Sequence, residues 1–207
     1  MDVIDKLAEV FKEFPGIGER QAKRFVYFLM RKNPAYAENL RSLIQDLKKE
    51  TRQCKACFRF FNLGHGGDDK SLCEICQSPA TDSSTLLVVE KDSDLESVKK
   101  SRTYHGKYFI LGGLVPIVEK ATKHRVRIEE LKEKIAREKK NGLAEIILAF
   151  SISPQGDHTD SYVREELKET VEKLQIKVSS LGKGLSTGTE LEYSDNDTLR
   201  NALKNRQ

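Results

Sequence analysis

The chain has 207 residues, which is enough for one full domain with smaller parts attached and too few for two large domains. Charged residues make up 33% of the sequence, hydrophobic residues 38%, and the formal net charge is +4. This mild positive charge excludes a histone-like protein, so any contact with nucleic acid is expected to come from a local basic surface. No apolar run is long enough to span a membrane, and the N-terminus lacks the apolar run of a signal peptide. These features predict a cytoplasmic protein that does not enter membranes.

The N-terminal part of the chain is predicted to contain three amphipathic helices. Apolar residues recur at helical spacing between Val3 and Phe14, and a second helical pattern runs from about Glu19 to Lys32. Asn33-Pro34 ends the second helix, because proline cannot continue it. A third helix is predicted from about Ala37 to Glu50. Its expected inner face consists of Leu40, Leu43, Ile44 and Leu47.

A turn with two glycines, Gly16 and Gly18, separates the first two helices. Such a turn exposes backbone N–H groups at the start of the second helix, where they suit an anion. With the basic residues of that helix they match a nucleic-acid phosphate backbone, although a basic stripe is more often only a solvated face. The turn can also serve only to pack two helices. On a helical wheel one side carries Arg20, Lys23, Arg24, Tyr27 and Arg31, and the other carries Ala22, Phe25, Val26 and Leu29.

Four cysteines form two close pairs with the spacing C-x2-C, fifteen residues, C-x2-C. Four thiolates in this pattern can bind one Zn²⁺ tetrahedrally, and without an export signal paired cysteines more often hold metal than form disulfides. The shell of thiolates is closed, so one structural zinc ion per chain is predicted. His65 is expected to be a solvated loop residue, and the nearby aromatic residues to form a small core rather than stack on bases. The predicted ligands are Cys54, Cys57, Cys73 and Cys76, and the aromatic residues are Phe58, Phe60 and Phe61.

From Thr85 onward, short apolar runs alternate with helical stretches. This alternation is typical of a parallel sheet that helices bury on both faces, so the fold class is α/β. Helices are predicted at 93–100, 127–140 and 161–174, and a short C-terminal helix is predicted with Asp195 or Asn196 as its N-cap. The predicted strands are Leu86–Glu90, Tyr108–Leu111, Glu145–Phe150 and Ile176–Leu181.

The order of these features resembles a known family. FPGIG followed by a helix resembles the helix-hairpin-helix motif of DNA-binding proteins. Together with the four-cysteine segment and an α/β region that opens with LLVVE, nearly the whole chain resembles the RecR family of bacterial recombination mediators. Further matching stretches are VVEKDSDLESV, YHGKYFILGGL, GLAEIILAF and KGLSTGTELEYSDNDTLRNAL.

The resemblance implies four parts: a helix-hairpin-helix DNA-binding module at 1–52, a four-cysteine zinc finger at 53–80, a Toprim domain at 81–182 and an oligomerisation tail at 183–207. Arg20 and Arg24 match the family's DNA contacts, and the expected DNA-binding set also includes Gly16, Gly18 and Lys23. An acidic Toprim surface that faces DNA and the RecO partner is implied at Glu90, Asp94 and Asp157.

The resemblance also implies an assembly. Family members form ring-like tetramers through their N-terminal and C-terminal segments, and these rings are large enough to encircle DNA. With RecO, and in many bacteria RecF, they load RecA onto single strands covered by single-strand-binding protein. Either the apolar faces of the first helix and the tail helix are the seams of this ring, or both faces pack within one subunit. These faces consist of Val3, Leu7 and Val10 in the first helix and Leu199 and Leu203 in the tail helix.

The sequence departs from the family pattern at several positions. SISPQGDHT stands where T-x-E-G-E-A-T is usual, so Gln155 and Asp157 replace two glutamates. The segment VPIVEKATKHRVRI lacks the usual Ser-Pro loop, and Lys183 replaces an arginine. These departures leave the acidic cluster and the partner contacts open.

Two other classes of protein compete with a DNA-binding mediator. An Mg²⁺-dependent Toprim nuclease or primase-like enzyme needs a strand-end glutamate and two aspartates spaced D-x-D. Glu90 meets the first requirement, but Asp157 and Asp160 are separated by two residues. A zinc-stabilised adaptor that never touches DNA does not explain the basic stripe. The sequence therefore predicts a non-enzymatic, zinc-containing DNA-binding protein.

Overall fold

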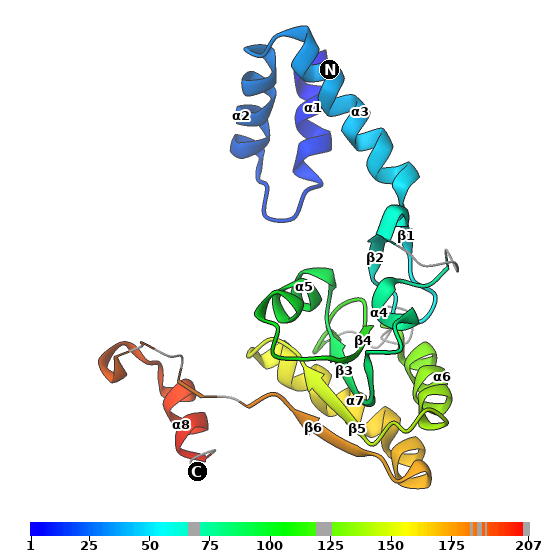
Figure 1. Ribbon diagram of the computed structural model, residues 1–207. Helices are drawn as coiled ribbons and strands as arrows, with labels where there is room; N and C mark the ends of the chain where they lie inside the picture. The colour runs from blue at the N-terminus through cyan, green and yellow to red at the C-terminus, as the bar shows by residue number, and fades with distance from the viewer. Residues whose placement is uncertain (66–70, 119–125, 183, 186–187, 189, 205–207) are drawn as a thin grey trace. The chain divides into compact units, whose positions relative to one another are not determined.

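The computed structural model describes residues 1–65, 71–118, 126–182, 184–185, 188 and 190–204 (Figure 1). The chain separates into two compact units, Met1–Thr51 (unit 1) and Arg52–Gln207 (unit 2). Lys183 and most of the basic segment 120–127 lie outside the described residues, as does the side chain of His65. Within the described part of the chain, no helix has the length and apolar character that crossing a membrane requires.

Unit 1 consists of three helices, α1 (Val3–Lys12), α2 (Glu19–Met30) and α3 (Pro34–Glu50). All three predicted helices are confirmed, but α1 ends before Phe14, and α3 begins three residues before the predicted Ala37. The side chain of Asn33 accepts the Tyr36 N–H at 2.9 Å, and Pro34 occupies the first helical position. Because that position needs no N–H donor, the proline that ends one helix also begins the next.

The core of unit 1 is small. Its buried hydrophobic cluster consists of Ala8, Ala22 and Val26. The predicted inner face of α3 is wrong: α3 has no buried residue, and its apolar side chains remain in contact with solvent. Helical periodicity shows that a helix is amphipathic but does not show what covers its apolar face. The exposed fractions are 57% for Leu43, 55% for Ile44 and 59% for Leu47.

Unit 2 is built around four parallel strands in the order β4-β3-β5-β6. The register places Leu87 of the central strand β3 between Tyr108 of β4 and Ile147 of β5. All four predicted strands are confirmed, with β3 beginning four residues earlier than expected. The strands are β3 (Asp82–Val89), β4 (Gly106–Ile110), β5 (Glu145–Ala149) and β6 (Lys177–Ser180).

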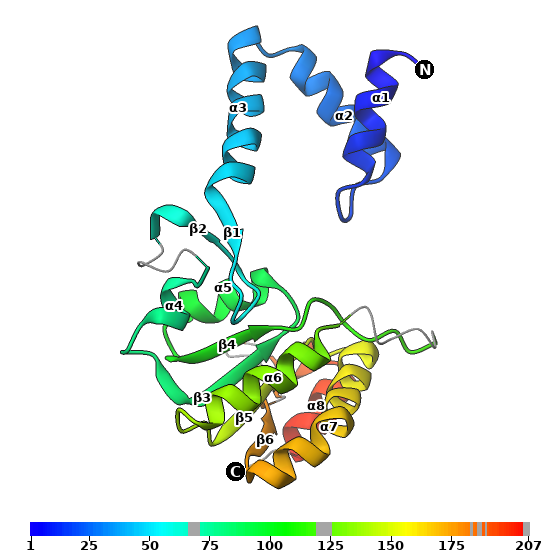
Figure 2. The ribbon, with the colours of Figure 1, turned by 90° about the vertical axis from the view of Figure 1, so that its right-hand side faces the viewer.

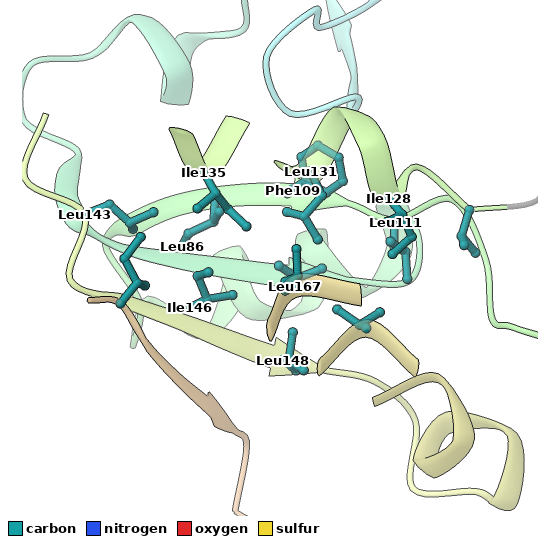
Figure 3. Packing of buried hydrophobic residues seen from close by; sticks show 14 of the residues in the cluster. Leu86, Phe109, Leu111, Ile128, Leu131, Ile135, Leu143, Ile146, Leu148 and Leu167 are labelled. Carbon is teal, nitrogen blue, oxygen red and sulfur yellow. The ribbon is translucent and has the colours of Figure 1, made fainter. Parts of the chain in front are cut away.

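Helices cover both faces of this sheet, as predicted. On one face, α6 (Ile128–Lys139) and α7 (Pro154–Leu174) contribute Leu131 and Leu167 to the main hydrophobic cluster (Figure 3). On the other face, Leu95 of α5 (Asp92–Ser101) packs in a cluster with residues of β3 and β4. The prediction that α7 begins near Ser161 is wrong by seven residues, because Ser153 caps the Gly156 N–H and starts the helix at Pro154.

The cysteine-bearing segment precedes the sheet (Figure 2). It contains the two-stranded ribbon β1 (Thr51–Gln53) and β2 (Phe60–Asn62), the short helix η1 (Leu63–His65) and α4 (Glu74–Gln77). After the sheet come η3 (Leu191–Tyr193) and α8 (Asn196–Lys204). The Asp195 carboxylate accepts the Thr198 N–H at 2.9 Å, which makes Asp195 the residue that caps α8.

Candidate functional site

The four cysteines converge on one point of unit 2. Their sulfur atoms all lie within 4.8 Å of one another, and the Sγ atoms of Cys57 and Cys73 are 3.6 Å apart. A tetrahedral zinc site with Zn–S bonds of about 2.3 Å places its sulfur atoms about 3.8 Å apart, so the arrangement fits this metal. All four lie in the described part of the chain as free thiols. The predicted metal cluster is therefore present, with Cys54, Cys57, Cys73 and Cys76 as its members.

Each cysteine pair lies in a tight turn that points its thiols inward. The Phe58 N–H donates to the Cys54 carbonyl at 2.9 Å, and the Cys76 N–H donates to the Cys73 carbonyl at 3.0 Å. Between the pairs, the Cys73 N–H donates to Cys54 Sγ at 3.3 Å. Such a donor stabilises a thiolate, and a thiolate is the form that binds metal.

The hydrogen bonds among the four thiols shift their pKa values in opposite directions. Hydrogen bonds from Cys57, and then from Cys73 and Cys76, hold the pKa of Cys54 far below its ordinary value. The hydrogen bond with Cys54 raises the pKa of Cys57 instead, and Cys76 is raised in the same way. The pKa values of Cys54 and Cys73 are thus lowered while those of Cys57 and Cys76 are raised, and a divalent ion bound by all four thiolates would remove this conflict.

The cysteine segment is joined to the sheet through Cys57 and Phe58. The Ile110 N–H donates to the Cys57 carbonyl at 2.9 Å. The ring of Phe58 packs edge-on against Phe109 with centroids 5.4 Å apart, and the Arg127 guanidinium lies 5.0 Å from the Phe58 centroid. Contacts of this kind couple the metal site to the hydrophobic core of the sheet.

The predicted aromatic core of the zinc module is confirmed only for Phe61. That residue is 4% exposed and packs with the cysteines. Phe58 belongs instead to the core of the sheet, and Phe60 is 59% exposed. Phe60 and Phe61 are neighbours in β2 and therefore point to opposite faces of the ribbon, whereas Phe58 precedes that strand with a φ of +64°. The sequence alone did not show which of these directions is covered.

The turn before α2 has the open geometry that the sequence predicted. Gly16 has a φ of +77°, a conformation that favours glycine. An added Cβ would meet nothing within 4 Å at Gly16 or at Gly18, so neither glycine is required for packing inside unit 1. Gly18 begins α2 and supplies no side-chain hydrogen bond to its first turn. The start of α2 is therefore a helix N-terminus without a side-chain cap.

The basic residues after this turn are at the surface. Arg20 and Arg24 are exposed, while Ala22 and Val26 of the same helix are buried, which confirms the predicted division into two faces. Gln21 holds the Arg24 guanidinium through a hydrogen bond of 3.1 Å. Two observations modify the expected pattern: Lys23 forms an ion pair with Glu19 at 3.2 Å, and Phe25 is 37% exposed rather than buried.

The acidic residues expected on the Toprim surface lie near the carboxyl ends of β3 and β5. Glu90 directly follows β3 and has 18% of its side chain exposed. Asp94 accepts the Lys91 N–H at 3.2 Å and thereby caps α5. The carboxylate of Asp92 accepts the Phe60 N–H at 2.8 Å, which links the start of α5 to the cysteine segment. Glu90 in turn forms an ion pair with Lys91 at 3.6 Å, so all three carboxylates have partners within the fold.

The aspartates after β5 do not form a metal site with Glu90. Asp157 is exposed in the first turn of α7, whereas Asp160 binds the Arg164 guanidinium at 2.6 Å and the Ser180 hydroxyl at 2.5 Å. Among the described residues, the one group of three or more His, Cys, Asp or Glu whose ligand atoms converge is the cysteine cluster. The carboxylates at this edge of the sheet remain separate.

Two residues at this edge were not singled out from the sequence. A Cβ on Gly156 would lie 1.9 Å from the Ser151 carbonyl oxygen, so only glycine allows α7 to start so close to the end of β5. Thr159 is fully buried, accepts the Val115 N–H at 2.9 Å and donates to the Gln155 carbonyl. A glycine inside a helical pattern was a visible signal, whereas the partner of Thr159 is distant in the sequence.

Comparison with known families identifies the class of protein. A family model described as Toprim domain matches residues 84–181, which span the four-stranded sheet, and one described as RecR, C-terminal matches residues 184–207. The chain is thus a Toprim-domain protein that carries a four-cysteine site ahead of its sheet.

Whole-chain relatives identify the family. Recombination protein RecR of Bacteroides thetaiotaomicron is 34% identical over 99% of this chain and 93% of its own length, and that of Bacteroides fragilis is 35% identical over the same shares. Recombination protein RecR of Legionella pneumophila is 32% identical over 100% of this chain and 96% of its own length. A designed Rossmann2x2 fold aligns with 59% of this chain and 87% of its own at 11% identity, with a TM-score of only 0.29. The chain belongs to the RecR family.

Proposed function

We propose that this protein is a DNA-binding mediator of recombinational DNA repair. The observation that carries the proposal is the uncapped start of α2, with exposed Arg20 and Arg24 directly after an open glycine turn, in a chain of the RecR family. Amide and guanidinium donors of this kind bind phosphate oxygens without reading bases. Gly16, Gly18 and Lys23 complete the proposed DNA-binding set.

The four-cysteine site is proposed to hold one structural Zn²⁺. The sulfur spacing fits tetrahedral thiolate coordination, and four protein ligands leave no open position for substrate. The proposed parts of the chain are a DNA-binding module at 1–52, a zinc finger at 53–80, a Toprim domain at 81–182 and an oligomerisation tail at 183–207. Bound metal would stabilise both the finger and the adjoining sheet.

The Toprim domain is proposed to act without catalysis. Mg²⁺-dependent Toprim chemistry needs several carboxylates that converge on metal ions, and here Asp94 and Asp160 are engaged in other contacts. Glu90, Asp94 and Asp157 are proposed instead to form a surface for DNA and a RecO-type partner. Cleavage or primer synthesis that requires Mg²⁺ and is lost in Glu90→Gln would contradict this part of the proposal.

The protein is further proposed to form a ring-like homotetramer in the bacterial cytoplasm. With RecO-type and RecF-type partners, this ring would help load RecA onto single-stranded DNA. Exposed apolar side chains on α1, including Val3 at 79% and Val10 at 53%, support self-association through unit 1. Several DNA-binding modules on one ring would raise the affinity through effective concentration.

The experiment that tests DNA binding compares the Arg20→Ala/Arg24→Ala variant with Arg41→Ala, which removes an exposed arginine elsewhere in unit 1. The double variant is expected to bind DNA of any sequence more weakly, and its logarithmic salt dependence should become shallower by about one unit per lost phosphate contact. Arg41→Ala should leave both quantities unchanged. Unchanged affinity and salt slope in a double variant that keeps its zinc and oligomeric state would contradict the proposal.

A further inference from the structure

A group of buried charged side chains lies beside the cysteine site, where α6 and β4 adjoin α4. Lys134 of α6 is 1% exposed, and Lys107 of β4 is 8% exposed. Lysine is almost never buried to this extent unless a partner stabilises its charge. The proposed DNA contacts and the acidic edge of the sheet do not explain why two ammonium groups are buried here.

The charges within this group do not balance. Lys134 Nζ lies 3.2 Å from Glu138 Oε1, and Asn141 donates to the other oxygen of that carboxylate at 3.1 Å. Desolvation alone would raise the pKa of Glu138, but Lys134, aided by Asn141 and Lys107, holds it below its ordinary value. Both lysines thus act on one carboxylate, which leaves one positive charge in excess.

The excess charge faces the cysteine site. Lys107 Nζ lies 3.4 Å from the carbonyl oxygens of Ile75 and Cys76. Cys76, Lys107 and Glu138 line one cleft of about 570 Å³. Glu138 connects Lys134 to this cleft, because its carboxylate lies 3.2 Å from Lys134 Nζ.

The other flank of the cysteine site is already neutral. Arg59 is buried there and binds Glu74 at 2.8 Å and Glu96 at 3.0 Å, and Lys99 also binds Glu74 at 3.1 Å. Two cations therefore face two carboxylates. Four thiolates around a divalent ion carry a net charge of about −2, and the unmatched positive charge on the side of Lys107 and Lys134 offsets part of it.

We propose that Lys107 and Lys134 are the charge-balancing residues of the zinc centre: their buried ammonium groups offset the negative charge of the four metal-bound thiolates, and zinc retention depends on them. Lys107 also orients the Cys76 turn through its carbonyl contacts. This inference rests on the proposed zinc site. Both lysines act through the ligands and not on the metal, so they are positioning residues.

The test measures the zinc dissociation constant of the full-length protein by competition with a chromophoric chelator. Lys134→Met is expected to raise this constant about 10- to 100-fold, the usual effect of losing an outer-shell partner of a metal site. Lys134→Arg should retain near-normal affinity because it keeps the charge. Glu138→Gln should tighten zinc binding severalfold, because it removes a negative charge near the thiolates. Lys132→Met is the matched control, because Lys132 lies on the same helix and pairs with Glu129 and Glu166.

Lys134→Met and Glu138→Gln are expected to change the zinc affinity in opposite directions, and this difference distinguishes charge balance from a merely structural ion pair. If Lys134 and Glu138 only stabilised the fold, both Lys134→Met and Glu138→Gln would weaken zinc binding, and that result would overturn the inference. If Lys134→Met does not fold, Lys107→Met and the Glu138→Gln comparison decide the question. Purified wild-type protein without zinc would contradict the proposed metal site itself, whereas zinc-loaded wild type with unchanged affinity in Lys134→Met would refute only the role of the lysines.

Discussion

Among the described residues, unit 1 buries a cluster of three hydrophobic residues, whereas the largest cluster of unit 2 buries fifteen. The difference is not caused by a lack of apolar residues in unit 1. Its helices carry many large hydrophobic side chains that remain exposed, among them Val3, Phe14, Leu43, Ile44 and Leu47. A unit this small can cover only part of its apolar surface, and exposed apolar surface of this kind is typical of an interface with another chain.

Unit 2 stabilises itself in a different way. Its sheet is covered on both faces, and its cysteine segment is attached through the Cys57 carbonyl and the ring of Phe58. We therefore expect unit 2 to be stable by itself when its proposed metal site is filled, and unit 1 to gain stability from the proposed association. Four sets of substitutions test this expectation, from the largest expected effect on stability to the smallest.

Cys57→Ser is expected to have the largest effect. It removes a thiolate ligand, so the zinc-coupled folding free energy, on the order of 10 kcal/mol, is lost from unit 2. Elemental analysis should find no tightly bound zinc, and thermal unfolding of the sheet should shift to lower temperature because Ile110 and Phe109 contact this segment. Ser97→Ala, on exposed α5 surface, is the control. A Cys57→Ser protein with one zinc ion and unchanged unfolding would show that the segment is independent of the metal.

Leu131→Ala is expected to lower the free energy of unfolding by about 2–5 kcal/mol, because Leu131 is fully buried in the main cluster and its truncation leaves a cavity. Leu43→Ala is the matched substitution in unit 1, where the side chain is 57% exposed. Its effect on the isolated subunit should stay within about 0.5 kcal/mol. Urea unfolding measures both. Equal losses of unfolding free energy in Leu131→Ala and Leu43→Ala would contradict the contrast between the buried core of unit 2 and the exposed apolar face of α3.

Gly16→Ser and Gly18→Ser should have small effects of opposite sign. Gly16 has a φ of +77°, so a side chain there should cost unit 1 about 1 kcal/mol. Gly18 lies at a φ of −86° at the start of α2, where a serine would cap the helix and stabilise it by about 0.5 kcal/mol. The same serine would occupy the amides proposed to bind phosphate, so Gly18→Ser should fold better yet bind DNA more weakly. If Gly18→Ser binds DNA as tightly as the wild type or more tightly, the backbone N–H groups at the start of α2 are not part of the DNA-binding site.

Leu43→Gln/Leu47→Gln is expected to change subunit stability least and assembly most. Both side chains are already in solvent on α3, so folding loses little apolar burial. If this face is a seam of the proposed ring, sedimentation should show smaller species than the wild type forms. Ser42→Ala on the same helix controls for helix propensity. An unchanged oligomer would leave α1 and the tail as the proposed seams and would require another role for the α3 face.

Much of this protein was predictable from local patterns. The spacing of the cysteines predicted the metal cluster, the apolar runs predicted all four parallel strands, and the glycine turn predicted where α2 begins. These features depend on residues that are close in the sequence, so neighbouring side chains and backbone preferences suffice to specify them. The errors at the starts of α3 and α7 arose because Asn33-Pro34 and Ser153-Pro154 are at once loop signals and helix caps.

Only the tertiary structure decided which side chains are covered and which are paired. Phe58 and Phe61 are close in the sequence, yet one completes the core of the sheet and the other the cysteine cluster. From the sequence, α3 and α2 each show one face of distinct character, apolar in α3 and basic in α2. Only the burial of their side chains in the structure shows that neither face is part of a core. The buried Lys134 pairs with Glu138, which lines one cleft with Cys76, a residue more than fifty positions earlier in the chain. Contacts between distant segments carry no local signature, because the chain must fold before the residues meet.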